Sequence, residues 1–220
     1  MSTAAKPAQK PLLRGVSHQI AFFVSLATGA WLTWQQPAGT ARWAVLVYYL
    51  CLSALFGISA AYHRPTWGVE ARQWMRRLDH AGIYLQIAGT YTPICLLAVR
   101  GDAGWHLLAW VWLGAGLGMV KTLAWVNSPK ALTALLYMVL SWAVVGQWSI
   151  VSAALGRIGL FWLMSGGVLY SLGALAYVLK RPNPVAKTFE YHEVFHVLVI
   201  LAAACHCWLV LQVAERFAHN

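Results

Sequence analysis

Charged residues are scarce in this sequence: they make up 10% of the 220 residues, and Asp and Glu together number only 6. Soluble domains carry about 25% charged residues, so this chain cannot cover itself with a polar surface. Hydrophobic residues make up 60% of the chain, and tryptophan occurs 13 times. The composition therefore excludes a soluble domain and predicts an all-α integral membrane protein without a second, polar domain.

Cysteine is also scarce. Cys51, Cys95, Cys205 and Cys207 form no CxxC pair, so we expect neither a thiolate zinc site nor a redox motif. Cys205-His206-Cys207 has the composition of a metal motif, but side chains at i and i+2 of a helix point to different faces, which indicates packing residues. The basic N-terminus lacks a small-residue cleavage site after a short apolar core, so no cleavable signal peptide is expected.

Seven apolar runs predict seven membrane-spanning helices. They cover about residues 19–35, 43–63, 78–99, 105–126, 131–155, 158–179 and 189–213. The expected domains are a basic, frayed tail (1–17), the seven-helix domain (18–214) and a short tail (215–220). Pro65 is expected to end the second helix, followed by a basic loop from Arg64 through Arg77.

The net charge of +10 is carried by short connections between these runs, where Lys and Arg meet anionic lipid headgroups rather than nucleic acid. Eleven Lys and Arg residues fall on the side of the N-terminus and four on the other side, with Lys121 left out because it lies inside the fourth run. Basic residues concentrate on the cytoplasmic side of membranes. We therefore expect a cytoplasmic N-terminus and a C-terminus outside.

Two histidines, His192 and His196, are four residues apart and so lie on one face of the last predicted helix. Such a pair can share a metal, most simply Zn²⁺ bound through nitrogen at about 2.0–2.1 Å. His63 ends the second run at the same, cytoplasmic depth and is the expected third ligand. A site of three histidines with an open fourth position is of the catalytic type, in which the metal lowers the pKa of a bound water to about 7.

Asp79 begins the third run at this depth and is expected to bind the metal directly or to act as general base toward the water. Ser59, four residues before His63, is expected to orient that water or a ligand. Simpler alternatives exist: Asp79 could cap its helix, His63 could be an interfacial histidine, and Ser59 could serve helix packing.

Three other polar residues are expected outside the metal site. His80 is expected to face solvent, and His206 lies about 15 Å deeper than His196 at about 1.5 Å per residue. Lys121 could pair with an interior acceptor or extend to the interface.

His192-Glu193-x-x-His196 also matches HExxH, in which the glutamate is the general base of a zinc protease. The pattern lies in the last run, whereas membrane-embedded zinc proteases generally take a further aspartate ligand from a later segment. Glu190 and Glu193 are expected on other faces of the helix than the histidines. We therefore favour Asp79 as the general base.

Three motifs together resemble the hemolysin III family, which belongs with the progestin and adipoQ receptors. They are Ser59-Ala60-Ala61-Tyr62-His63, then Leu78-Asp79-His80-Ala81-Gly82-Ile83 followed by Ala88-Gly89-Thr90-Tyr91-Thr92-Pro93, and finally His192-Glu193-Val194-Phe195-His196. The resemblance implies a seven-helix bundle with the N-terminus inside, in a bacterial inner membrane. It also implies Zn²⁺ bound by His63, His192 and His196, contacted by Asp79 through water.

The resulting hypothesis is a zinc-dependent hydrolase of a lipid amide or ester, because adiponectin receptors are associated with ceramide hydrolysis. Such an enzyme would serve membrane lipid or energy homeostasis, with membrane lipids as partners and substrate. One alternative is a non-catalytic sensor in which zinc joins the second, third and seventh helices. The other is a pore-forming, cytolytic protein, as the family name suggests.

Overall fold

The computed structural model describes residues 10–125 and 127–218 and, of Lys130, the backbone only. The regular secondary structure of these residues is helical, apart from an isolated bridge between Val185 and Phe189. The end of the predicted fourth run, at residue 126, lies outside the described residues. The α-helices are α1 (Val16–Gln35), α2 (Thr40–His63), α3 (Val69–Pro93), α4 (Gly101–Ala124), α5 (Lys130–Ser141), α6 (Trp148–Leu179) and α7 (Tyr191–Ala218).

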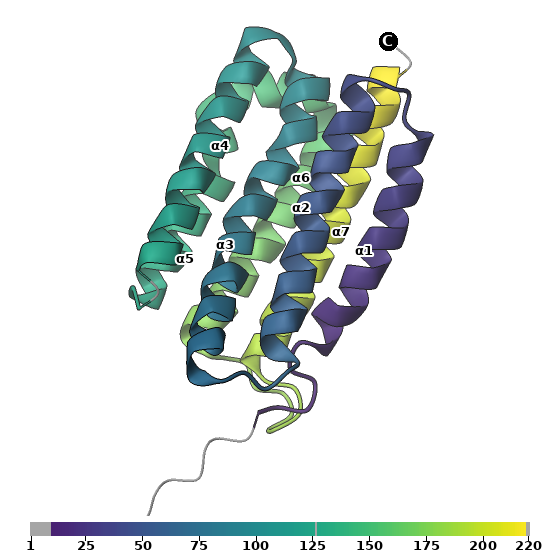
Figure 1. Cartoon of the computed structure of the whole chain (residues 1–220). Coiled ribbons are helices and arrows are strands. Elements are labelled where there is room, and N and C mark those ends of the chain that lie inside the picture. The colour runs from purple at the N-terminus through teal and green to yellow at the C-terminus, as the bar shows by residue number, and fades with distance from the viewer. Residues whose placement is uncertain (1–9, 126, 219–220) are drawn as a thin grey trace, which may run out of the picture.

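The helices pack side by side in a bundle (Figure 1). Along the chain, α1 packs on α2, α2 on α3, and α3 on α4, while α6 packs on α7. α7 also contacts α1 and α2, so the first and last helices lie side by side (Figure 1, purple and yellow). This arrangement brings the start of α1, the end of α2 and the start of α7 to one end of the bundle.

Five segments of the described chain are long and apolar enough to cross a membrane. They are Thr40–His63, Val69–Val99, Gly101–Ala124, Ala131–Leu179 and Tyr191–Ala218. Large apolar side chains such as Trp110, Leu117 and Phe161 are exposed on the outside of the bundle, where lipid would cover them. The chain is therefore an α-helical membrane protein. α1 is not among the five segments, and the predicted runs 131–155 and 158–179 fall within one of them.

The third helix begins nine residues before its predicted apolar run. α3 starts at Val69, so Arg72, Arg76 and Arg77 lie on a helix, and the predicted basic loop is wrong beyond Gly68. Hydropathy marks where a helix becomes apolar, whereas the helix itself begins where backbone hydrogen bonds begin. Asp79 is consequently ten residues into α3, and its alternative role as an N-terminal cap is wrong.

The predicted fifth run contains a break that its hydropathy does not show. α5 ends at Ser141, and a 3₁₀ segment, η2 (Ala143–Gln147), precedes α6, which is itself interrupted at Gly156. The Tyr91 hydroxyl fills the first break: it donates to the Ser141 carbonyl at 2.8 Å and accepts from the Val144 N–H at 2.9 Å. A broken helix is tolerated within a membrane protein when such partners satisfy the freed backbone groups.

Two glycines of α4 provide a matched test of this packing. A Cβ at Gly118 would overlap the ring of Tyr84, which is 1% exposed, whereas a Cβ at Gly116 would meet no atom within 4 Å. We expect Gly118→Ala to lower stability by about 1–3 kcal/mol through overpacking, while Gly116→Ala leaves it unchanged or slightly raised. Thermal unfolding of both variants in the same detergent measures this, and equal stability would contradict the observed contact of α3 with α4.

Candidate metal centre

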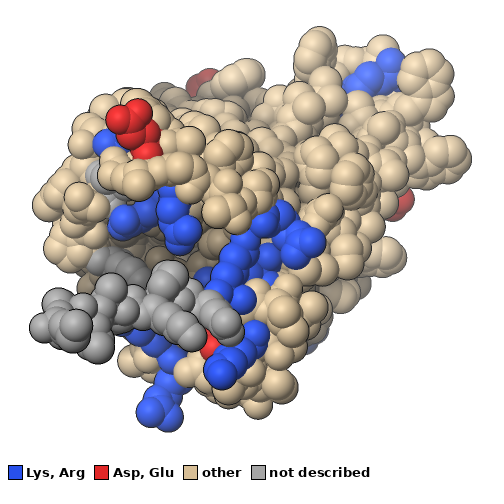
Figure 2. Space-filling model, turned by 60° about the horizontal axis from the view of Figure 1, so that its bottom comes forward, with Lys and Arg blue, Asp and Glu red and all other residues tan. Residues whose placement is uncertain are grey.

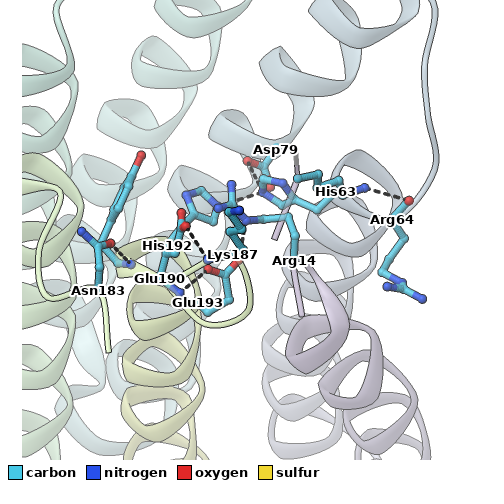
Figure 3. A network of polar contacts seen from close by, with 11 residues as sticks. Arg14, His63, Arg64, Asp79, Asn183, Lys187, Glu190, His192 and Glu193 are labelled. Carbon is cyan, nitrogen blue, oxygen red and sulfur yellow. Dashed lines mark hydrogen bonds and ion pairs between the residues drawn. The ribbon is translucent and has the colours of Figure 1, made fainter. Parts of the chain in front are cut away.

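Three histidines converge at one end of the bundle. His63 is the last residue of α2, and His192 and His196 occupy the first two turns of α7. One possible ligand atom from each of the three lies within 4.8 Å of the others. The Nε2 atoms of His63 and His192 are 3.0 Å apart (Figure 3). The predicted ligand set, drawn from two helices more than a hundred residues apart in sequence, is therefore one cluster in space.

The start of α7 is fixed by side chains that occupy its free backbone N–H groups. The Glu193 carboxylate accepts from the N–H of Glu190 at 2.8 Å, and Asn183 Oδ1 accepts from the N–H of Tyr191 at 2.9 Å. A glutamate that reaches back three residues in this way is half of a capping box. The helix therefore begins at Tyr191, and His192 and His196 share a face from its first turn.

Asp79 and Ser59 complete the cluster from the neighbouring helices. Asp79 Oδ2 lies 3.9 Å from His63 Nε2, and the Asp79 side chain is 14% exposed (Figure 3). Ser59 is buried one turn before His63 on α2 and interacts with the Asp79 carboxyl group. At 3.9 Å the carboxylate lies beside the histidine nitrogens rather than in hydrogen-bond contact with them.

The donor set fits a zinc ion. Three imidazoles are a ligand set that Zn²⁺ commonly takes, and ligand nitrogens around tetrahedral zinc are about 3.3 Å apart. The observed separations include one of 3.0 Å and none above 4.8 Å, so they lie on both sides of this value. His196 is 1% exposed, and its Nδ1 has no hydrogen-bond partner among the described residues. The chemistry and the geometry of the three side chains thus agree with a metal site.

Glu193 is occupied away from the cluster. Its Oε1 forms an ion pair with Arg14, and its Oε2 accepts from the Glu190 N–H. The side chain of Glu193 is 2% exposed, so this is a buried pair. Both carboxylate oxygens therefore serve the N-terminal segment and the helix start, which agrees with the expectation that Glu193 is not the general base.

The segment before α1 is docked, and the prediction of a frayed tail is wrong for residues 10–17. Leu12 and Leu13 donate backbone hydrogen bonds to the carbonyls of Lys187 and Thr188 at 3.1 and 3.2 Å. Lys10 Nζ donates to the Arg64 carbonyl at the end of α2 at 2.8 Å. Partial burial, followed by the charge of Arg64, lowers the pKa of Lys10. This segment therefore joins the ends of α2 and α7 beside the histidines.

The other candidates from the sequence lie elsewhere. His206 Nε2 contacts the Leu163 carbonyl at 3.2 Å, and Cys207 Sγ lies 3.2 Å from the Tyr48 hydroxyl, both far along α7 from the cluster. Lys121 Nζ donates to Ser128 and Thr133 at 2.6 and 2.9 Å, so it has interior acceptors. His80 is half-buried and lines a cavity, so the expectation that it faces solvent is wrong.

One histidine of this cluster was not predicted. His18, in the first turn of α1, is 2% exposed and stacks on the ring of His196. The available signal was a histidine at the start of the first apolar run. The charge distribution places that histidine on the same side of the membrane as the other ligands. Its partner lies 178 residues away, which no spacing rule reveals.

A cavity of about 150 Å³ extends from the cluster into the bundle. Asp79, His192 and His196 line one end, and Tyr170 and His206 line it further along their helices. Its walls are mostly apolar, which suits a lipid chain more than a water-soluble ligand. The histidines and the carboxylate thus face a space that an acyl chain could enter.

Comparison with known proteins finds a matching family model and several relatives. A family model described as "Haemolysin-III related" matches residues 7–207. The chain is 34% identical over 134 residues to "Hemolysin-3" of Bacillus cereus, a match that covers 61% of this chain and 58% of that protein. It is 31% identical over 167 residues to "Hemolysin-3 homolog" of Bacillus subtilis, covering 76% and 72%. It is 28% identical over 180 residues to "Adiponectin receptor protein" of Drosophila melanogaster, covering 72% and 40%.

Proposed function

This chain belongs to the haemolysin III-related family, with weaker similarity to adiponectin receptor-like proteins, and we propose that it is a zinc-dependent membrane hydrolase of a lipid amide or ester. The observation that carries the proposal is the convergence of His63, His192 and His196 beside the Asp79 carboxylate, at the end of an apolar-walled cavity. A purely structural metal site would have no need of a carboxylate and a cavity at the same point.

The proposal includes seven membrane spans with the N-terminus in the cytoplasm. α1 would be one span beyond those found by length and hydropathy, and the 131–179 segment would count as two spans instead of one. Lys and Arg side chains gather around the end of the bundle near the N-terminus (Figure 2), which favours a cytoplasmic location for that end. The metal centre then lies toward the cytoplasm, and the membrane would be the inner (plasma) membrane of a bacterium.

The residues divide the reaction between them. His63, His192 and His196 would hold the zinc ion, which would supply a Lewis acid and would lower the pKa of a water at the site. The Asp79 carboxylate accepts a proton as water adds to the substrate carbonyl, and returns it to the nitrogen or oxygen that leaves as the C–N or C–O bond breaks. Ser59, which lines the same cavity, would orient the Asp79 carboxyl group. The products are a fatty acid and an amine or alcohol.

A second role is favoured by one observation: the three ligands connect α2 with α7, which are distant in sequence. A zinc ion there would staple the bundle, and the protein would be a non-catalytic sensor. In that case removing zinc lowers thermal stability but no lipid is consumed.

Turnover by the purified protein separates the two roles. The protein in lipid nanodiscs is incubated with a panel of N-acyl and O-acyl lipids, including a ceramide, and released fatty acid is measured. We expect release from at least one lipid, its loss on treatment with a chelator, and its recovery with added Zn²⁺. Stoichiometric zinc with no release from any lipid of the panel would favour the staple.

A further inference from the structure

His18 makes an unusual contact for a buried histidine. Its ring stacks on that of His196 with centroids 3.8 Å apart and an angle of 6° between the planes. Neither ring nitrogen has a hydrogen-bond partner among the described residues, although the side chain is 2% exposed. Burying polar atoms without partners costs free energy. The His18 side chain therefore contacts its neighbours through the face of its ring and not through its nitrogens.

The backbone that carries His18 is held tightly against the metal centre. Gly15 has a φ of +79°, and a Cβ at this position would lie 2.6 Å from the Cβ of His63. A residue with a side chain would thus be both strained and too large here. On the two sides of Gly15, Arg14 pairs with Glu193 and Val16 begins α1. The start of α1 therefore has little freedom to move relative to the histidines.

We propose that His18 is a positioning residue for the metal centre, which orients the His196 ring by stacking on its face. An imidazole can turn about its Cβ–Cγ bond, and a second ring parallel to it restricts this rotation. When a ring nitrogen binds a cation, the imidazole becomes electron-poor, and the face of a neighbouring aromatic ring attracts it. The inference rests on the proposed zinc site, because orientation of His196 matters only if His196 is a ligand.

Simple packing is the competing explanation. His18 also contacts Phe56, with ring centroids 5.0 Å apart, so it could serve only to fill space between α1 and α2. A space-filling residue affects stability, whereas a positioning residue affects the metal itself. The discriminating quantity is therefore how the metal is held, not how stable the protein is.

The test compares His18→Ala, which removes the ring, with His18→Phe, which keeps an aromatic face without nitrogens. Phe22→Ala is the matched control, because Phe22 lies one turn further along α1 and packs at Gly57, away from the histidines. Zinc release to a chromogenic chelator and the visible spectrum of the Co²⁺-substituted protein are measured in detergent. We expect His18→Ala to release zinc about 10-fold faster or more, with a changed Co²⁺ spectrum. His18→Phe and Phe22→Ala should stay within about threefold of the wild type.

Two results would overturn the inference while leaving the zinc site intact: an unchanged release rate and spectrum in His18→Ala, or equal damage in His18→Phe. The second result would mean that the ring nitrogens, and not the stacked face, are needed. If His18→Ala cannot be purified as a folded protein, His18→Leu removes the aromatic face while keeping most of the volume, and the same two criteria apply. A wild-type protein that binds no Zn²⁺ would refute the zinc site itself, and this inference with it.

Discussion

We expect the zinc content to fall from about one ion per chain to near zero when His63, His192 or His196 is replaced by alanine. Each of these side chains contributes one of three clustered nitrogens, and a two-ligand remnant is below the three protein ligands that zinc sites require. Elemental analysis of each variant, purified by the same protocol, measures the loss. Because the ion joins α2 to α7, we also expect each variant to unfold at a lower temperature than the zinc-loaded wild type.

His206→Ala is the matched control for these variants. His206 is also a histidine of α7 and is 6% exposed, but it contacts the Leu163 carbonyl and lies well beyond the cluster. We expect the His206→Ala variant to be less stable than the wild type but to keep its zinc ion. Retention of one zinc ion by His192→Ala, or loss of zinc from His206→Ala alone, would show that the ion is bound elsewhere.

Asp79→Asn should abolish turnover without removing the metal. The amide keeps the size of the carboxylate and its place 3.9 Å from His63 Nε2, but it cannot accept a proton. General-base catalysis contributes about 10²–10⁴-fold to rate, so we expect a loss of at least about 100-fold in kcat with a zinc content near one. Fatty acid release in nanodiscs and elemental analysis of the same sample provide the two readouts.

Asp102→Asn controls for the loss of a negative charge in the membrane domain. Asp102 is an exposed residue in the first turn of α4, which begins at the opposite end of the bundle, and its replacement should leave turnover unchanged. If Asp79→Asn loses zinc together with activity, then Asp79 is a direct ligand. If it keeps both, the carboxylate is not the proton acceptor and the hydrolase mechanism is wrong.

The sequence predicted the part of the metal centre that local spacing controls. His192 and His196 share a helical face because they are four residues apart, and His63 and Asp79 followed once the apolar runs had been assigned alternate directions. Their meeting in space required only that the helices pack side by side. Pro65 likewise predicted the end of α2, which the structure has at His63.

The parts that could not be predicted depend on contacts between distant residues. His18 meets His196, Arg14 pairs with Glu193, and Tyr91 fills the break between α5 and η2. Hydropathy cannot show these contacts because each joins a polar side chain to a residue at least 50 positions away in the sequence. The early start of α3 was missed for a different reason. Its first turns carry polar residues, which form a helix as readily as apolar ones but do not have the hydropathy of a membrane span.

The most direct test of the metal centre is anomalous diffraction from crystals of the purified protein, recorded above and below the zinc absorption edge. The account predicts one anomalous peak, within bonding distance of His63, His192 and His196, that disappears below the edge. Protein that diffracts well but shows no such peak after incubation with Zn²⁺, or shows it at Cys205-His206-Cys207 instead, would contradict the account.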